Sequence, residues 1–239
     1  MKYEQLEPFG RALPRLRARV EEDLRRNRPD RDLVTAALVR LIDGAALRVG
    51  SQSYARENGT IGATTLQSRH VALDGTRLKL DYRAKGGQRV RKQIKDRTLA
   101  RVLGRIDDLP GRMLFTYLDE DDETRTVRSD DVNAYIAETM DLDEVTAKTF
   151  RTWQGSVVAL DHAASEPDTL TIKALAEAAS RRLHNTPSIA RSSYIHPRII
   201  ALAEMDATER KATLDAVDLR RAPNDLPTEE KRLVALLAG

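Results

Sequence analysis

Hydrophobic positions follow a helical period over most of the chain. Residues 11–26 and 31–48 carry apolar side chains at spacings of three and four residues, which predicts two amphipathic helices. The same period predicts further helices at about 95–107, 129–140, 144–164, 170–183, 187–194, 198–204, 207–217 and 227–238. The pattern therefore indicates a chain that is mostly helical.

The period changes to two residues in one segment, 68–94. Apolar and polar residues alternate there, and the pairs Asp74-Gly75 and Gly86-Gly87 interrupt the alternation, which predicts about three antiparallel strands. A short strand pair is also predicted between Arg112 and Arg128, around the acidic turn DEDDE. The predicted fold is mainly α with a small antiparallel β-sheet inserted at about 60–94 (an α+β fold), in a single catalytic domain that spans residues 1–239.

The distribution of charge indicates what kind of partner the chain binds. The chain has 40 basic residues, of which 31 are Arg, and an isoelectric point near 9.2. The guanidinium group of Arg presents a planar fork of donors that matches phosphate. Basic residues are concentrated from Lys85 to Arg101, on the predicted sheet, which favours a polyanionic partner. The acidic run from Asp119 to Asp131 is more typical of a solvated surface.

Several classes of chemistry are excluded by what the sequence lacks. There is no Cys, so disulfides, thiolate chemistry and Cys-based zinc sites are ruled out, and the 4 His residues do not pair at metal-ligand spacing. We find no glycine-rich phosphate loop, no signal peptide and no apolar run long enough to cross a membrane. The sequence predicts no metal, no cofactor, no membrane partner and a cytoplasmic location.

A phosphodiester can be transferred to a tyrosine without a metal ion if side chains supply every function. The pKa of a free phenol is about 10, so nearby cations must favour the phenolate. Fixed Arg donors can stabilise charge on the non-bridging oxygens, and a cationic acid can protonate the leaving alkoxide. The expected set is one Tyr, two Arg, one Lys and one further donor.

The chain contains this set in four short segments. The segment ALRVG supplies Arg48 and is followed by Tyr54, RAKGGQR supplies Lys85, KTFRTWQGSVVAL supplies Lys148 and Arg151, and NTPSIARSSYIHP supplies Asn185 and Tyr194.

Each candidate also has a purely structural interpretation. Arg48 could end its helix and favour the helix dipole, and Asn185 could be the N-cap of the helix that follows. Arg151 could stack on Trp153, Lys85 could be an ordinary exposed turn residue, and Tyr194 could be an aromatic residue at the end of a helix.

In order, spacing and wording, these segments resemble the catalytic domain of type IB DNA topoisomerases of the bacterial and poxviral branch, over about residues 3–200. The resemblance implies the catalytic fold shared by these enzymes and the tyrosine recombinases. It also implies that Tyr194 is the nucleophile that forms a 3′-phosphotyrosyl bond. Arg48 and Arg151 would hold the scissile phosphate, Lys85 would be the general acid for the 5′-oxygen, and Asn185 would donate a hydrogen bond to a non-bridging oxygen.

The resemblance also implies a partner and a reaction. Duplex DNA would be bound largely through its phosphates, with DNA contacts from Tyr54, Lys148, Arg89 and Arg191. Supercoils would be relaxed by transient cleavage and religation of one strand without ATP or metal, by a monomer associated with a bacterial nucleoid.

The chain departs from the family pattern at its N-terminus. Family members usually begin with a β-rich domain that closes over DNA, whereas this sequence starts at MKYEQL, where the catalytic domain would begin. We therefore expect this chain to lack the N-terminal clamp domain and to bind DNA more weakly.

Two other functions remain open. A tyrosine recombinase or integrase shares the Arg–Lys–Arg–Tyr logic, but recombinases usually have His-x-x-Arg where this chain has Lys148 and Arg151. A DNA-binding module without catalysis is the other. His184 and His196 flank the last segment, and their roles are open.

Overall fold

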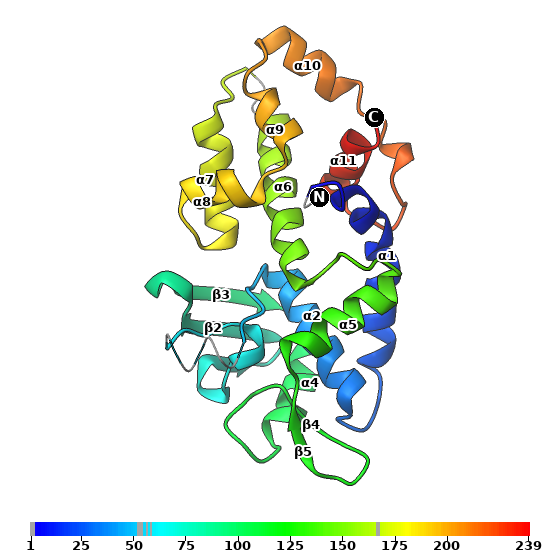
Figure 1. Cartoon of the computed structure of the whole chain (residues 1–239), viewed down its shortest axis with the longest axis vertical. Helices are drawn as coiled ribbons and strands as arrows, with labels where there is room; N and C mark the ends of the chain where they lie inside the picture. The colour runs from blue at the N-terminus through cyan, green and yellow to red at the C-terminus, as the bar shows by residue number, and fades with distance from the viewer. Residues whose placement is uncertain (1–2, 52–54, 56, 58, 166–167) are drawn as a thin grey trace. The chain divides into compact units, whose positions relative to one another are not determined.

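The structure, a computed structural model, describes residues 3–51, 55, 57, 59–165 and 168–239. The chain forms two compact units, one made of Met1–Pro14 and Thr149–Gly239 and the other of Arg15–Lys148. The boundaries fall inside α1 (Leu6–Asp23), which contains Pro14, and near the start of α6 (Ala147–Ser165). Mainly helical elements with a small antiparallel sheet confirm the predicted fold class (Figure 1).

The unit Arg15–Lys148 is built around α2 (Arg31–Ala45), which is buried along most of its length. Its N-terminus is capped by Asp30, whose carboxylate accepts a hydrogen bond from the backbone of Leu33 at 2.9 Å. Helices α4 (Arg97–Asp107) and α5 (Ser129–Met140) both contact α2.

The larger sheet of this unit has 3 strands in the order β1-β2-β3, formed by Val71–Asp74, Arg77–Arg83 and Arg89–Lys95. In β2 exposed and buried residues alternate, so that Leu78, Leu80 and Tyr82 face the interior. Helices α2 and α4 contact β3 and β2 respectively (Figure 1). A second, two-stranded sheet pairs β4 (Thr116–Leu118) with β5 (Thr124–Thr126), at the strand pair predicted from the sequence.

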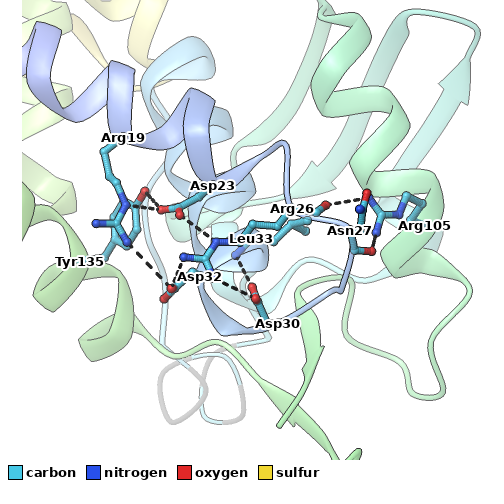
Figure 2. A network of polar contacts seen from close by, with 9 residues as sticks. All are labelled: Arg19, Asp23, Arg26, Asn27, Asp30, Asp32, Leu33, Arg105 and Tyr135. Carbon is cyan, nitrogen blue, oxygen red and sulfur yellow. Dashed lines mark hydrogen bonds and ion pairs between the residues drawn. The ribbon is translucent and has the colours of Figure 1, made fainter. Parts of the chain in front are cut away.

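A polar network fixes the connection between α1 and α2 (Figure 2). Its centre is Asp23, which is 1% exposed and accepts hydrogen bonds from Arg19 at 2.7 Å, Arg26 at 3.0 Å and the hydroxyl of Tyr135 at 2.8 Å. Burial and the hydrogen bond to Asp23 raise the pKa of Tyr135. Because Asp23 is buried, the loss of one of these donors would leave its charge poorly solvated and would destabilise the unit.

The other unit contains most of α6 together with α7 (Ile172–Leu183), α8 (Pro187–Tyr194) and α9 (Pro197–Leu202). It is completed by α10 (Ala207–Asp215), a 3₁₀ turn at Leu219–Arg221, α11 (Thr228–Leu237) and the first turns of α1.

Aromatic residues form the centre of the core of this unit. The ring of Phe9 packs edge-on against Phe150 at 5.0 Å and against Trp153 at 5.8 Å. Gly10 allows this approach, since a Cβ there would lie 2.4 Å from the Trp153 ring. The indole N–H donates to the buried carboxylate of Glu230 at 3.3 Å.

Several helix ends differ from the sequence predictions, and the first two helices show this. The first helix runs over Leu6–Asp23 instead of 11–26. The second ends at Ala45 instead of Arg48, because Ala46 takes a left-handed conformation with φ of 52° and turns the chain away from the helix axis. No helix in the described part of the chain is long and apolar enough to cross a membrane.

Candidate functional site

The predicted site residues fall into two groups, one in each unit. Arg48, Lys85, Arg89 and Lys148 belong to the unit Arg15–Lys148. The other unit holds Arg151, Asn185, Arg191 and Tyr194. Tyr54 lies outside the described residues.

Arg48 and Lys85 line one pocket of about 360 Å³. The remaining lining comes from the chain after Arg48 (Val49, Gly50 and Ser51), from Thr60, Ile61 and Gly62, and from Ser129. The structure therefore brings together the two cations that the sequence predicts for this unit.

Arg48 lies beyond the end of α2, in a segment that pairs through its backbone with the chain at Ala63. The interpretation of Arg48 as a helix-terminal residue is therefore wrong. Its carbonyl accepts a hydrogen bond from Ala63 N at 2.8 Å, and the next carbonyl, of Val49, accepts one from Thr64 N at 2.8 Å. Gly50 and Gly62 permit this pairing, since a Cβ on Gly62 would lie 2.4 Å from the Gly50 Cα. The half-buried Arg48 therefore projects from a segment fixed on both sides.

Lys85 begins the turn between β2 and β3. Gly86 and Gly87 adopt φ of 75° and 72°, a region that glycine enters without strain. The hydrogen bond from Ala84 N to Gln88 O, at 2.8 Å, closes the turn, and Lys85 itself is exposed. A second bond, from Ile61 N to Arg83 O at 2.9 Å, ties the hairpin to the segment beside Arg48.

Arg89 and Lys148 are both exposed. Arg89 makes a bidentate ion pair with Asp81 at 2.7 Å and 2.8 Å, and this pair lowers the pKa of Asp81. An exposed pair of this kind contributes little to stability. Lys148 lies in the first turn of α6.

In the other unit, Arg151 and Tyr194 are brought together where the end of α8 approaches α6. The Arg151 guanidinium carbon lies 4.9 Å from the centroid of the Tyr194 ring. Arg151 is 2% exposed and donates to the carbonyl of Leu183 at 3.0 Å. The guanidinium therefore lies over the face of the Tyr194 ring, in a cation–π geometry.

Asn185 follows the C-cap of α7. Its side-chain oxygen and nitrogen are both buried, and neither has a hydrogen-bond partner among the described residues. The N-cap of α8 is Thr186, whose hydroxyl accepts from Ile189 N at 3.3 Å, so the N-cap interpretation of Asn185 is wrong. Because an unsatisfied buried polar group costs about 1–3 kcal/mol, this amide is well suited to a ligand oxygen.

The two histidines that flank this segment have backbone roles. His184 is the C-cap of α7, in a left-handed conformation with φ of 48°. His196 is the N-cap of α9, where its Nδ1 accepts from Arg198 N at 3.1 Å. Burial and the charge of Arg198 lower the pKa of His196, in keeping with a nitrogen that accepts a hydrogen bond.

Arg191 is exposed on α8 and lines a second pocket, of about 630 Å³, with Tyr3, Ser188 and Ser192. Sequence reasoning did not single out Gly62, Gly155 or Ser156, which hold the segments that carry Arg48 and Tyr194. An isolated Gly within a helical pattern, as at Gly155, was the one available signal. Among the described residues no cluster of His, Cys, Asp or Glu could hold a metal ion.

A family model described as the catalytic core of eukaryotic DNA topoisomerase I matches residues 1–190. The chain therefore belongs to this family, which confirms the type IB resemblance drawn from the sequence. The match includes Arg48, Lys85, Arg151 and Asn185 and ends before Tyr194.

A curated relative, DNA topoisomerase 1B of Acanthamoeba polyphaga mimivirus, is 26% identical over 208 residues. The alignment covers 81% of this chain and 62% of the relative, so the chain spans less than two thirds of that protein's length.

Proposed function

We propose that this protein relaxes supercoiled DNA as a type IB topoisomerase. It cleaves one strand of a duplex by transferring a phosphodiester to Tyr194, and it later reseals that strand without ATP or a metal ion. The observation that carries the proposal is the buried guanidinium of Arg151 at 4.9 Å from the Tyr194 ring. Membership of the family supports it.

The cleavage step assigns one role to each candidate. The phenol of Tyr194 loses its proton to solvent, and the phenolate oxygen attacks phosphorus. The new bond joins phosphorus to the phenolic oxygen, and the bond to the 5′-oxygen breaks. Lys85 gives a proton to that 5′-oxygen, so that a hydroxyl leaves instead of an alkoxide. Religation is the reverse, and Lys85 recovers its proton.

Arg48, Arg151 and Asn185 act on the non-bridging oxygens of the same phosphate. Negative charge accumulates on these oxygens in the transition state, so fixed donors bind the transition state more strongly than the ground state. The unpartnered amide of Asn185 supports this role, since a phosphate oxygen satisfies its buried N–H group.

The exposed face of the larger sheet supports binding to duplex DNA. Alternation in β2 and β3 places Asp81 on this face among six cations, namely Arg77, Lys79, Arg83, Arg89, Arg91 and Lys95. Such a surplus of cations matches the phosphate backbone and carries no base-specific pattern. We propose that the protein binds DNA largely through phosphates, with Lys148 and Arg191 contributing, and acts as a monomer because one tyrosine cuts one strand.

Plasmid relaxation tests the proposed function. Purified protein incubated with supercoiled plasmid in EDTA, without ATP, should produce a ladder of relaxed topoisomers, because side chains supply all of the chemistry. A plasmid without any paired recombination site should serve equally well, which separates a topoisomerase from a recombinase. Binding with neither relaxation nor a trapped covalent adduct would instead indicate a DNA-binding module without catalysis.

DNA affinity should depend strongly on salt. Each neutralised phosphate contributes about −0.9 to the slope of log K against log salt concentration. Replacing both Arg77 and Arg83 by Ala should make this slope shallower by about 2. Arg220→Ala is the matched control, because Arg220 is equally cationic but pairs locally with Asp218. Fluorescence anisotropy with a labelled duplex measures the slope, and an unchanged slope in the double variant would place DNA elsewhere.

A further inference from the structure

The backbone that carries Tyr194 is held by one buried hydroxyl. Ser156, in α6, is 0% exposed and donates from Oγ to the Tyr194 carbonyl at 3.3 Å. The same oxygen accepts a hydrogen bond from His196 N at 3.0 Å. These two groups lie at the end of α8 and the start of α9, where backbone groups lack partners within their own helices. One side chain therefore satisfies both ends of the connection that follows Tyr194.

Gly155, the residue before Ser156, lets the backbone at Tyr194 approach α6 closely. A Cβ on Gly155 would lie 2.6 Å from the Tyr194 carbonyl oxygen and 3.1 Å from the Tyr194 Cβ. It would also lie 3.1 Å from the Cδ1 atom of Leu183, whose carbonyl accepts the hydrogen bond of Arg151. Any side chain at this position would displace the Tyr194 backbone from α6.

Gly155 and Arg151 share one face of α6. Residues four apart on a helix are neighbours on its surface, so Arg151 lies one turn before Gly155. One rigid helix thus carries the cation that faces the Tyr194 ring, and it also carries the two residues that fix the Tyr194 backbone. The distance between the guanidinium and the phenol ring is therefore set by how closely the end of α8 approaches α6.

We propose that Gly155 and Ser156 are positioning residues. They hold the phenol of Tyr194 at a fixed position relative to Arg151, from which it attacks phosphorus. The inference rests on the proposed function, in which Tyr194 is the nucleophile. Neither residue touches the substrate, and each acts through the Tyr194 backbone. Small displacements of a nucleophile cost rate steeply, about 10²-fold for an error near 1 Å.

The first test is Ser156→Ala, which deletes a single oxygen atom. Single-turnover cleavage of a suicide duplex should slow by about 10- to 100-fold, whereas the Kd for the duplex should stay within about twofold. The defect should persist when sulfur replaces the 5′-bridging oxygen, because the placement of the nucleophile matters for any leaving group. Ser180→Ala is the matched control, because the Ser180 hydroxyl is also buried but bonds only within its own helix, to Glu177 O at 2.9 Å.

Gly155→Ala tests the same contact between α6 and the Tyr194 backbone, which we call the Tyr194 seat, by steric displacement. Cleavage should slow by at least as much as in Ser156→Ala, since the added Cβ meets backbone that cannot rotate away. Gly44→Ala is its control, because Gly44 also lies in a helix but a Cβ there would meet no described atom within 4 Å. Thermal unfolding of each variant separates a loss of folded protein from a loss of rate per folded molecule.

A readout independent of activity distinguishes this inference from the proposed function. With fluorotyrosine incorporated, the ¹⁹F signal of Tyr194, assigned by its loss in Tyr194→Phe, should shift in Ser156→Ala and stay in place in Ser180→Ala. If the wild type forms no adduct but this shift is seen, the seat stands and the proposed function fails. If the wild type cleaves DNA and Ser156→Ala cleaves equally fast, or only melts at a lower temperature, the inference is overturned.

Discussion

Replacing Tyr194 with phenylalanine is expected to abolish both the covalent protein–DNA adduct and plasmid relaxation. The change removes one oxygen atom and leaves the ring against Arg151, whose guanidinium carbon lies 4.9 Å from the ring centroid. The fold and the DNA-binding cations remain, so affinity for a duplex should stay within about twofold of the wild type, a difference below about 0.5 kcal/mol. The loss of reaction should be complete because the phenolic oxygen is the atom that bonds to phosphorus.

The measurement is denaturing electrophoresis of protein mixed with end-labelled suicide duplex. Wild-type protein should carry the label, and Tyr194→Phe should not. Tyr117→Phe is the matched control, because Tyr117 lies on β4 and lines a pocket that contains none of the candidate catalytic residues. A labelled adduct that survives in Tyr194→Phe would mean another nucleophile, and peptide mapping would then show whether it is Tyr54.

The fold could be predicted from the sequence because its elements have strong local signals. The alternation in Arg77–Arg83 matches the observed exposure of β2 residue by residue, and Gly86 takes the positive φ expected of a turn. Helix starts at Asp30 and Asp96 carry the capping residues that local chemistry favours. These signals depend on neighbours in sequence and needed no knowledge of packing.

Predictions that depended on packing were less successful. The apolar period runs through Leu47, but the helix ends at Ala45 because backbone pairing with Ala63 holds Arg48 in an extended segment. Asn185 and Thr186 are both good N-caps, and the left-handed turn at His184 gives the cap to Thr186. The helix end at Ala45 is decided by a chain segment distant in sequence, and the cap of α8 by the way the preceding helix ends.

The candidate site shows the same division. The candidate residues were identified from short segments whose sequences resemble a known family. The structure places Arg48 with Lys85 and Arg151 with Tyr194. No spacing rule relates α6 to the end of α8, so the seat made by Gly155 and Ser156 could not be predicted. It depends on a close approach of backbone that only tertiary packing produces.

Lys85→Ala should slow cleavage of an ordinary duplex by roughly 10² to 10⁴, the usual contribution of a general acid. Lys85 is exposed at the end of a hairpin and lines a pocket with Arg48, so its ammonium group can reach a phosphodiester held there. Protonation matters because the 5′-alkoxide is a poor leaving group. With sulfur in place of the 5′-bridging oxygen, a thiolate leaves without a proton, so the defect should largely vanish.

The comparison of the two substrates gives Lys85 a signature that no other residue of the set shares. Tyr194→Phe should be inactive on both, since it lacks the nucleophile. Lys173→Ala is the matched control, because it removes an exposed lysine of α7 that pairs with Glu177 and lies outside the proposed DNA-binding face, and it should leave the cleavage rate on both substrates nearly unchanged. An equal loss for Lys85→Ala on oxygen and sulfur would make Lys85 a phosphate anchor, and the acid would then have to be Arg48, Arg151 or His184.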